Sequence, residues 1–243
     1  MEPRNLEQML LQGRPLKLAE GALLASGVRD ERAFTTCLTG IEHLSRHVAS
    51  AVEGDDEDRA RGLFLWLSES TPRRWQRGGS YRLSDVVDAQ LGGRAGVGNC
   101  LGLTLLYNVL AQEMGLRVTA VHLEDAFAAG PHVFTVLRTK ERSFDIEHMF
   151  PSGFDFPGHR DSPGRDDWGD RELIADVYHS RGCDHAERHE WKDAADCYRK
   201  ALQLNPRYVR ARLNTGIALV ELDHVDEART WFQSLRSRPA ADA

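Results

Sequence analysis

Three residues that lie far apart in the sequence, Cys100, His132 and Asp145, could together carry out acyl transfer. A cysteine thiolate can attack a carbonyl carbon, a histidine beside it can take up and return the proton, and an acidic side chain can orient the histidine. These residues form such a triad only if the helices and strands that carry them bring the three side chains to one place.

Cys100 is predicted to open a helix. It lies in the stretch G-V-G-N-C-L-G-L-T-L-L-Y, residues 96–107, where a glycine-containing loop passes into an apolar run. Apolar residues recur in that run at spacings of three and four, as is typical of a helix packed in a core: Leu101, Leu105, Leu106, Val109, Leu110 and Met114. Gly115 is expected to end the helix.

The start of this helix favours a reactive cysteine. Asn99 is a typical N-cap residue, and Gly98 leaves the backbone free to approach its neighbours closely. The positive end of the helix dipole stabilises a thiolate, and the backbone N–H of Cys100, which has no partner within a helix, can bind an oxyanion. The alternative is a cysteine packed as a small apolar residue.

His132 and Asp145 are predicted to lie on two strands of a hairpin. Beyond the cysteine helix the pattern changes to that of strands, over residues 117–123, 132–138 and 143–148. His132 opens the second of these strands, and Asp145 lies within the third.

The loop of this hairpin decides whether the two side chains can meet. Because side chains alternate between the faces of a strand, His132 and Asp145 share a face only if the loop has an even number of residues or a bulge shifts one strand. One such pairing has a four-residue loop over 138–141 and places Asp145 opposite Phe134. His132 then lies two residues before Phe134 on the same face of the strand, diagonal to Asp145.

The ordered segments N-C-L-G-L-T, H-V-F and F-D-I-E resemble the three core motifs of the transglutaminase-like superfamily of cysteine enzymes, whose core is papain-like. The resemblance covers about residues 60–150. It implies Cys100 as the nucleophile, His132 as general base and acid, and Asp145 as the residue that orients the histidine. It also implies an α+β fold in which the cysteine helix packs against an antiparallel sheet.

Members of this superfamily hydrolyse peptides, crosslink amides, remove glycans, or bind partners without an intact triad, so the fold does not specify the substrate. The resemblance implies no cofactor. Papain-like sites also use a side chain to assist the oxyanion, and no motif identifies it here. The candidates are Gln90, Trp66 and Trp75.

A metal site is not predicted. The residues that could build one show no HExxH-type or paired-ligand spacing: His122, Glu124, Glu147 and His148. The remaining cysteines form no C-x-x-C pair and lie in helical runs, so they are expected to be core residues: Cys37, Cys183 and Cys197.

The composition is that of a globular protein that can bury a substantial core. The sequence has 243 residues, 41% of them hydrophobic and 28% charged, with a net charge of -6. This charge argues against nucleic acid as a partner, and the basic cluster of Arg73, Arg74 and Arg77 around Trp75 is predicted to be a solvated surface. No segment has the pattern of a signal peptide or a membrane span, so we expect a cytoplasmic protein without a membrane partner.

Three parts are predicted along the chain. Residues 1–150 form the transglutaminase-like core with a helical N-terminal region, in which Asp30 and Asp55 are expected N-caps. Residues 151–174 are rich in Gly, Pro, Asp and Arg and are expected to form a linker or a flap. The last part comprises residues 175–243.

This last part carries an internal repeat. Positions 34 residues apart, which is the tetratricopeptide period, hold similar residues: Gly182 and Gly216, Ala194 and Ala228, Tyr198 and Phe232. The pattern resembles a pair of tetratricopeptide repeats. Bacterial members of the transglutaminase-like superfamily include proteins with such repeats C-terminal to the core, and two repeats alone rarely bury enough surface to be stable.

Two functions of different classes are consistent with these features. The first is a cysteine-dependent amide or peptide hydrolase or transamidase, in which the repeats recruit a protein or peptide substrate. Hydrolysis and transfer both begin from the same thioester, so both stay open. The second is a non-catalytic interaction module in which the repeats bind a protein partner.

Overall fold

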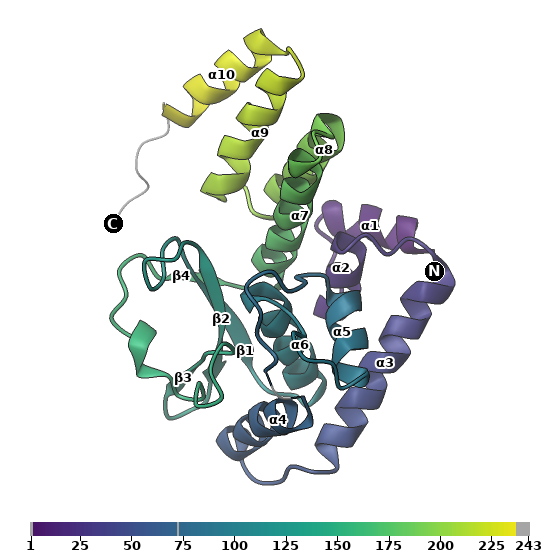
Figure 1. The fold of residues 1–243 in the computed structure, drawn as a ribbon, viewed down its shortest axis with the longest axis vertical. Coiled ribbons are helices and arrows are strands. Elements are labelled where there is room, and N and C mark those ends of the chain that lie inside the picture. The colour runs from purple at the N-terminus through teal and green to yellow at the C-terminus, as the bar shows by residue number, and fades with distance from the viewer. Residues whose placement is uncertain (1, 72, 237–243) are drawn as a thin grey trace. The chain divides into compact units, whose positions relative to one another are not determined.

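The computed structural model describes residues 2–71 and 73–236. The chain divides into two compact units, Met1–Leu173 and Ile174–Ala243, which are described separately below. The first unit combines helices with a small antiparallel sheet, and the second is helical (Figure 1).

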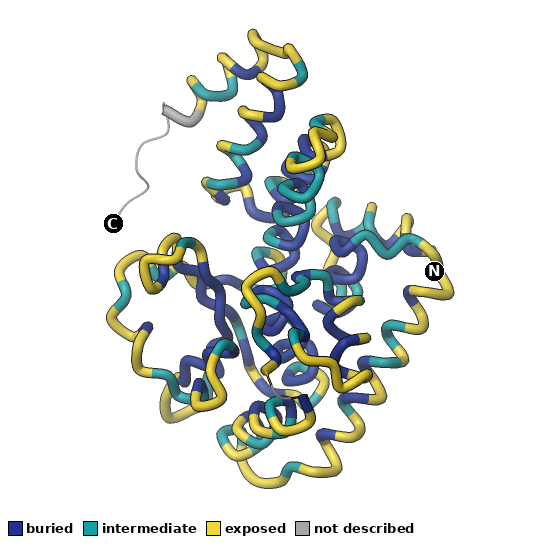
Figure 2. Tube along the Cα trace, in the orientation of Figure 1, coloured by how far each residue is buried: buried dark blue, intermediate teal, exposed yellow. Residues whose placement is uncertain are grey.

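The helices of the first unit precede its sheet. They are α1 (Pro3–Leu11), α2 (Leu18–Ala25), α3 (Glu31–Ala49), α4 (Asp56–Ser70), α5 (Leu83–Leu91) and α6 (Cys100–Glu113). Both predicted N-caps are confirmed, because Asp30 accepts a hydrogen bond from the Ala33 N–H and Asp55 accepts one from the Asp58 N–H. Helix α6 is buried from residue 101 to residue 111, and Figure 2 shows it in dark blue.

The sheet of the first unit has the strand order β3-β2-β1-β4, and all neighbouring strands are antiparallel. Its strands are β1 (Val118–Leu123), β2 (His132–Arg138), β3 (Ser143–Ile146) and β4 (Asp166–Trp168). Helix α6 packs against β1 and β2, as Figure 1 shows. The expected combination of a cysteine-bearing helix with an antiparallel sheet is therefore present.

Polar side chains hold α6 against the elements around it. The Thr104 hydroxyl donates to the carbonyl of Val133 in β2 at 3.2 Å, and the Tyr107 hydroxyl donates to the carbonyl of Ala60 in α4 at 2.8 Å. Buried polar groups require such partners. These bonds therefore fix how α6, which begins at Cys100, is rotated relative to the strand that begins at His132.

Two glycines let the start of α6 approach the preceding chain. A Cβ atom on Gly102 would lie 2.4 Å from the carbonyl oxygen of Ser80, and a Cβ atom on Gly98 would lie 2.9 Å from the same oxygen. The backbone of Gly98 does not have a positive φ. Glycine is therefore required at position 98 because a side chain would collide with Ser80, and not because of an unusual backbone torsion.

Much of the predicted linker or flap, residues 151–174, is structured within the first unit. It contains the 3-10 helix η1 (Pro157–His159) and strand β4, which pairs with β1. The Trp168 ring is buried and stacks on the ring of His122, with 4.2 Å between ring centroids. A three-residue strand is too short to show an alternating pattern, which is why sequence periodicity missed it.

The second unit consists of helical hairpins. Its helices are α7 (Asp170–Glu187), which begins in the first unit, α8 (Trp191–Leu204), α9 (Val209–Glu221) and α10 (Val225–Arg236). A Cβ atom on Gly182 would lie 2.5 Å from the Tyr198 ring, and one on Gly216 would lie 2.3 Å from the Phe232 ring. The same glycine–aromatic contact recurs after 34 residues, so the predicted repeat is confirmed in the packing.

None of the helices formed by the described residues combines the length and apolar character needed to cross a membrane.

Replacing Gly102 with alanine is expected to destabilise the first unit by about 1–3 kcal/mol, because the new methyl group collides with the Ser80 carbonyl. Alanine has the higher helix propensity, so the loss is a steric effect. Urea denaturation of the full chain measures it. Gly78→Ala is the matched control, since no atom lies within 4 Å of a Cβ added there. Equal stability of the two variants would contradict the close approach.

Replacing Ala194 with leucine is expected to overpack the contact between repeat helices and to cost about 1–3 kcal/mol of unfolding free energy. Ala194 is fully buried in α8. Lys192→Leu places the same side chain at an exposed position of that helix and serves as the control. Thermal or urea unfolding followed by circular dichroism distinguishes the two, and an unchanged midpoint for Ala194→Leu would show that the repeat register is wrong.

Candidate active site

Cys100 is the first residue of α6 and is half-buried. The Asn99 side chain accepts a hydrogen bond from the Gly102 N–H at 3.0 Å, which confirms Asn99 as the N-cap. Backbone N–H groups in the first turn of a helix have no carbonyl partner within the helix. The sulfur of Cys100 therefore lies where the helix dipole is positive and where backbone donors are free of intrahelical bonds.

The loop before Cys100 is held by the chain around Trp75. The Gly98 N–H donates to the Arg74 carbonyl at 3.2 Å, and the Gln76 N–H donates to the Gly98 carbonyl at 3.0 Å. Trp75 and Gly98 form an isolated parallel bridge. This pairing holds the segment that contains Trp75 against Gly98, which lies two residues before Cys100.

The basic cluster in this segment was predicted to be a solvated surface, and that prediction needs correction. Arg73 and Arg77 are exposed, but Arg74 is buried, with 6% of its surface accessible. The Arg74 side chain reaches Gln90 of α5, whose side-chain oxygen accepts a hydrogen bond from its Nε at 3.1 Å. One arginine of the cluster therefore enters the interior while the others stay in solvent.

His132 begins β2 and is buried. Its Nε2 donates to Glu147 Oε2 at 2.6 Å, and Cys100 lies within hydrogen-bonding range of the same imidazole, which leaves Nδ1 for the sulfur. Burial by itself lowers the pKa of His132, but the hydrogen bonds with Cys100 and Glu147 outweigh it and raise the pKa to about 9. The imidazole is therefore held between a thiol and a carboxylate.

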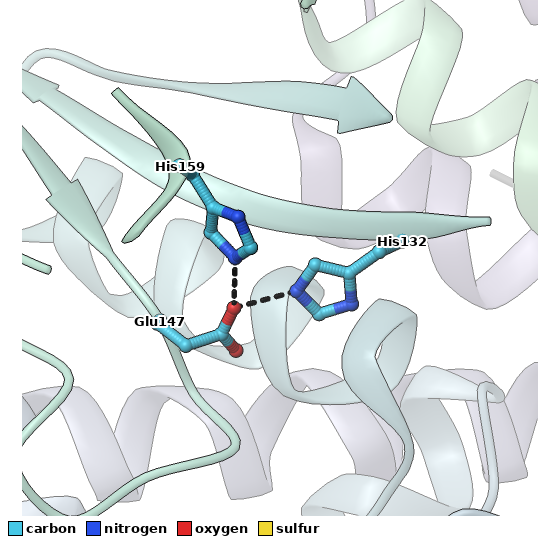
Figure 3. Close-up of side chains that lie close together, drawn as sticks. All are labelled: His132, Glu147 and His159. Atoms are coloured by element: carbon cyan, nitrogen blue, oxygen red, sulfur yellow. Dashed lines mark hydrogen bonds and ion pairs between the residues drawn. The ribbon is translucent and has the colours of Figure 1, made fainter. Parts of the chain in front are cut away.

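Glu147 is the acidic residue of this arrangement, and it is 1% exposed. Its Oε2 accepts hydrogen bonds from Nε2 of His132 and from Nε2 of His159, the latter at 2.9 Å, as Figure 3 shows. Its Oε1 accepts from the Met149 N–H at 2.9 Å. Burial alone raises the pKa of Glu147, but these bonds bring it down to about 2, so the carboxylate is ionised.

The expectation that Asp145 orients His132 needs correction. Both oxygens of the Asp145 carboxylate accept hydrogen bonds from the guanidinium of Arg165, at 2.7 and 2.9 Å. Arg165 also donates to the carbonyl of His159 at 2.7 Å. Asp145 thus helps to hold the segment that carries His159, while Glu147 contacts His132 directly.

The strand register explains this difference. In the structure Asp145 lies opposite Val136, so it shares a face with His132 but is two same-face steps away along β2. The loop has four residues, 139–142, which is even as predicted but one position later than the example pairing. If this register continues by one same-face step beyond Asp145, Glu147 lies opposite Phe134, which is the position where Asp145 was expected.

His159 was not identified from the sequence. It lies in η1, within the Gly- and Pro-rich stretch that was predicted to be a linker or flap. Its ring is buried and stacks on Phe134 of β2, with 4.7 Å between centroids. No local pattern marks it. Glu147, by contrast, lies two residues after Asp145 in F-D-I-E, and strand alternation could have identified it as a second acidic candidate on the same face.

A cavity of about 280 Å³ lies over the sulfur and the imidazole. Trp75, Asn99, Cys100, Phe127, His132 and Met149 are among the residues that line it. Of the side chains considered for the oxyanion, Trp75 lines this cavity. Gln90 instead donates to Ser70 and Thr71, and Trp66 lies beside the ring of His47.

The ligand atoms of His132, Glu147 and His159 all lie within 4.8 Å of one another, so this trio has the donor types of a divalent metal site. Among the described residues, His122 and His148 do not belong to any cluster of converging metal-ligand atoms. The two histidines instead contact Trp168 and Thr135.

Comparisons with known proteins address the second unit. A tetratricopeptide repeat family model matches residues 179–243, and repeats of this kind generally mediate protein–protein interaction. Searches among curated proteins and among solved structures give no significant match. The family match lies outside residues 60–150, and no family match supports the resemblance of those residues to the transglutaminase-like superfamily. The C-terminal part of this chain is thus a tetratricopeptide region, which supports a role in protein interaction.

Proposed function

We propose that this protein is a cysteine-dependent acyl-transfer enzyme in which Cys100 is the nucleophile, His132 is the general base and acid, and Glu147 orients the histidine. One observation carries the proposal. His132 is hydrogen-bonded on one side to the carboxylate of Glu147 and on the other to Cys100, and the pair Cys100 and His132 faces a cavity. This is the relation that nucleophilic cysteine catalysis requires.

The first half of the reaction forms a thioester. At neutral pH the proton is already on Nδ1 of His132, and the sulfur of Cys100 attacks the carbonyl carbon of an amide or ester as a thiolate paired with this imidazolium. The negative charge moves to the carbonyl oxygen, which the N–H groups at the start of α6 can stabilise, and the indole N–H of Trp75 is a candidate second donor. His132 then gives its proton to the departing amine or alcohol, and the thioester remains on Cys100.

The second half releases the acyl group. His132 takes a proton from water or from an acceptor amine, which attacks the thioester carbonyl. The sulfur then leaves as a thiolate, and the proton stays on His132, which restores the starting pair. Throughout both halves Glu147 stays ionised and accepts the Nε2–H bond, so the ring keeps Nδ1 directed at the reacting atoms. Hydrolysis and transamidation differ only in which acceptor enters.

The tetratricopeptide region suits recruitment of a protein or peptide substrate. Helix α9 exposes a row of apolar side chains at helical spacing: Val209, Leu213, Ile217 and Val220. These residues equally favour the second candidate, a non-catalytic interaction module. Reactivity of the cysteine distinguishes the candidates, because an interaction module needs no activated thiol.

Cys100 is expected to react with iodoacetamide much faster at pH 6 than Cys37 or Cys197, because the pKa of His132 is about 9 and its imidazolium stabilises a thiolate below that pH. The imidazolium is present at pH 6–8 and is lost as the pH rises through about 9. Mass spectrometry of the alkylated peptides measures each site.

This measurement is best made with Cys183→Ser in the background. Cys183 packs against the core of the repeats, as the sequence predicted, but its sulfur also contacts His179, Tyr198 and Asn214. Burial raises the pKa of Cys183, but the hydrogen bonds with His179 and Tyr198 together with the charges of His179 and Arg210 outweigh it and lower the pKa, so this thiol can react as well. His132→Ala should bring Cys100 to the level of Cys37. If Cys100 and Cys37 are alkylated at equal rates in the chain with His132 intact, the interaction module is the better-supported function.

Glu147→Gln is expected to lower the pKa of His132 by about one unit or more, because a neutral amide no longer stabilises the imidazolium. The pH above which Cys100 loses the help of the imidazolium in alkylation should fall by the same amount. Asp145→Asn is the control, since Asp145 bonds Arg165 rather than His132, and it should shift the His132 pKa much less. NMR titration of the His132 ring gives both values. An equal shift in the two variants would contradict the assignment of Glu147.

A further inference from the structure

A second cavity of about 570 Å³ adjoins the one at Cys100. The two cavities share Trp75 and Met149 in their linings, so these two side chains border both of them. The second cavity is also lined by Arg74 and His148. No Asp or Glu occurs among the described residues that line it.

Arg74 brings an unbalanced positive charge to this cavity. Its Nε donates to the Gln90 side-chain oxygen at 3.1 Å, while its Nη2 is buried and has no hydrogen-bond partner among the described residues. Burial lowers the pKa of Arg74 to about 10, so the guanidinium is still charged at neutral pH. A buried charge without a counter-charge is unfavourable. An anionic ligand would supply both the missing charge and the missing acceptor.

His148 supplies a complementary acceptor. The Thr135 hydroxyl has one proton and donates it to Asn108 Oδ1 at 2.6 Å, so it must accept its second bond, at 2.9 Å, from Nε2–H of His148. Burial, followed by the charge of Arg74, lowers the pKa of His148 to about 3, so the ring is neutral. Its Nδ1 is then a buried acceptor, and no described residue donates to it.

The position of Arg74 relative to the nucleophile is determined by the backbone. The Arg74 carbonyl accepts from the Gly98 N–H, and Gly98 lies two residues before Cys100. The neighbouring Trp75 forms the bridge with Gly98 and contributes to both cavities. A group bound at Arg74 is therefore held close to the loop that leads into Cys100, beside a side chain that lines both cavities.

We propose that Arg74 anchors a carboxylate of the substrate of the Cys100 site, and that Nδ1 of His148 accepts a hydrogen bond from an N–H group beside that carboxylate. The link to Cys100 rests on the proposed function. One guanidinium and a neutral imidazole match one negative charge, which favours a carboxylate over a phosphate dianion. The substrate class is an amide or peptide with a carboxylate near the scissile bond, which is either a free C-terminus or an Asp or Glu side chain.

Titration calorimetry on the full chain with Cys100→Ala, which prevents turnover, tests the anchor. N-acetyl-alanyl-alanine and its C-terminal amide form one pair, and N-acetyl-glutamyl-alanine amide and its glutaminyl counterpart form the second. The first pair tests a C-terminal carboxylate and the second a side-chain carboxylate. Inorganic phosphate is the third probe. In at least one pair the acid should bind about tenfold or more tightly than its neutral counterpart.

Substitutions at the two adjacent arginines sharpen the test. Arg74→Gln should abolish the preference for the acid, and Arg74→Lys should retain part of it, since lysine keeps the charge but not the planar fork. Arg73→Gln removes an equal charge from an exposed position on the same cavity and should keep the preference within about twofold. The comparison of acid with neutral peptide needs no substitution of Arg74, so it stands even if an Arg74 variant does not fold.

Equal binding of acids and neutral peptides would overturn the proposal, and so would tighter binding of phosphate than of either acid. In the chain with Cys100 intact, the preferred acid should also slow alkylation of Cys100 by iodoacetamide. Binding without this protection would overturn the link between the anchor and the substrate site. A separate measurement tests the proposed function. If Cys100 and Cys37 are alkylated at equal rates in the absence of peptide, the proposed function is wrong.

Discussion

The site depends on one buried carboxylate. Glu147 is 1% exposed, and an ionised group in such a place is stable only with strong hydrogen bonds. Its Oε2 is shared by His132 and His159, and its Oε1 is satisfied by the Met149 N–H. The carboxylate therefore joins the strand that presents His132 to a segment much later in the chain. It also sets the charge of the imidazole that faces Cys100.

Near this site one buried charge is paired with an opposite charge, and another is not. The charges of Asp145 and Arg165 neutralise one another, and Arg165 also donates to the backbone carbonyl of His159. This pair therefore holds in place the histidine that donates to Glu147. Arg74 is more deeply buried than Arg165 and has a neutral partner in Gln90. A paired buried charge contributes to a fixed structure, whereas an unbalanced one beside a cavity indicates a ligand of opposite charge. Under the proposed function, the first arrangement holds the catalytic groups and the second selects what they act on.

Much of the fold followed from local patterns. The apolar spacing of three and four predicted α6, Asn99 was identified as its cap, and the alternating runs predicted β1, β2 and β3. The period of 34 residues predicted the helical hairpins of the second unit. Strand β4 and η1 were missed because elements of three residues carry no period. The placement of Cys100 and His132 side by side followed once the helix and the hairpin were both right.

The sequence alone therefore determined which residue types stand at helix starts and strand starts, because capping and side-chain periodicity act over a few neighbouring residues. Tertiary structure decided which acid meets His132. A shift of the hairpin by one position exchanged Asp145 for Glu147, and the alternation of side chains does not distinguish the two registers because both keep the same residues on each face. It likewise decided that Arg74 is buried while Arg73 and Arg77 are not. That outcome depends on the pairing of Trp75 with Gly98, a contact between residues too far apart for any local pattern to report.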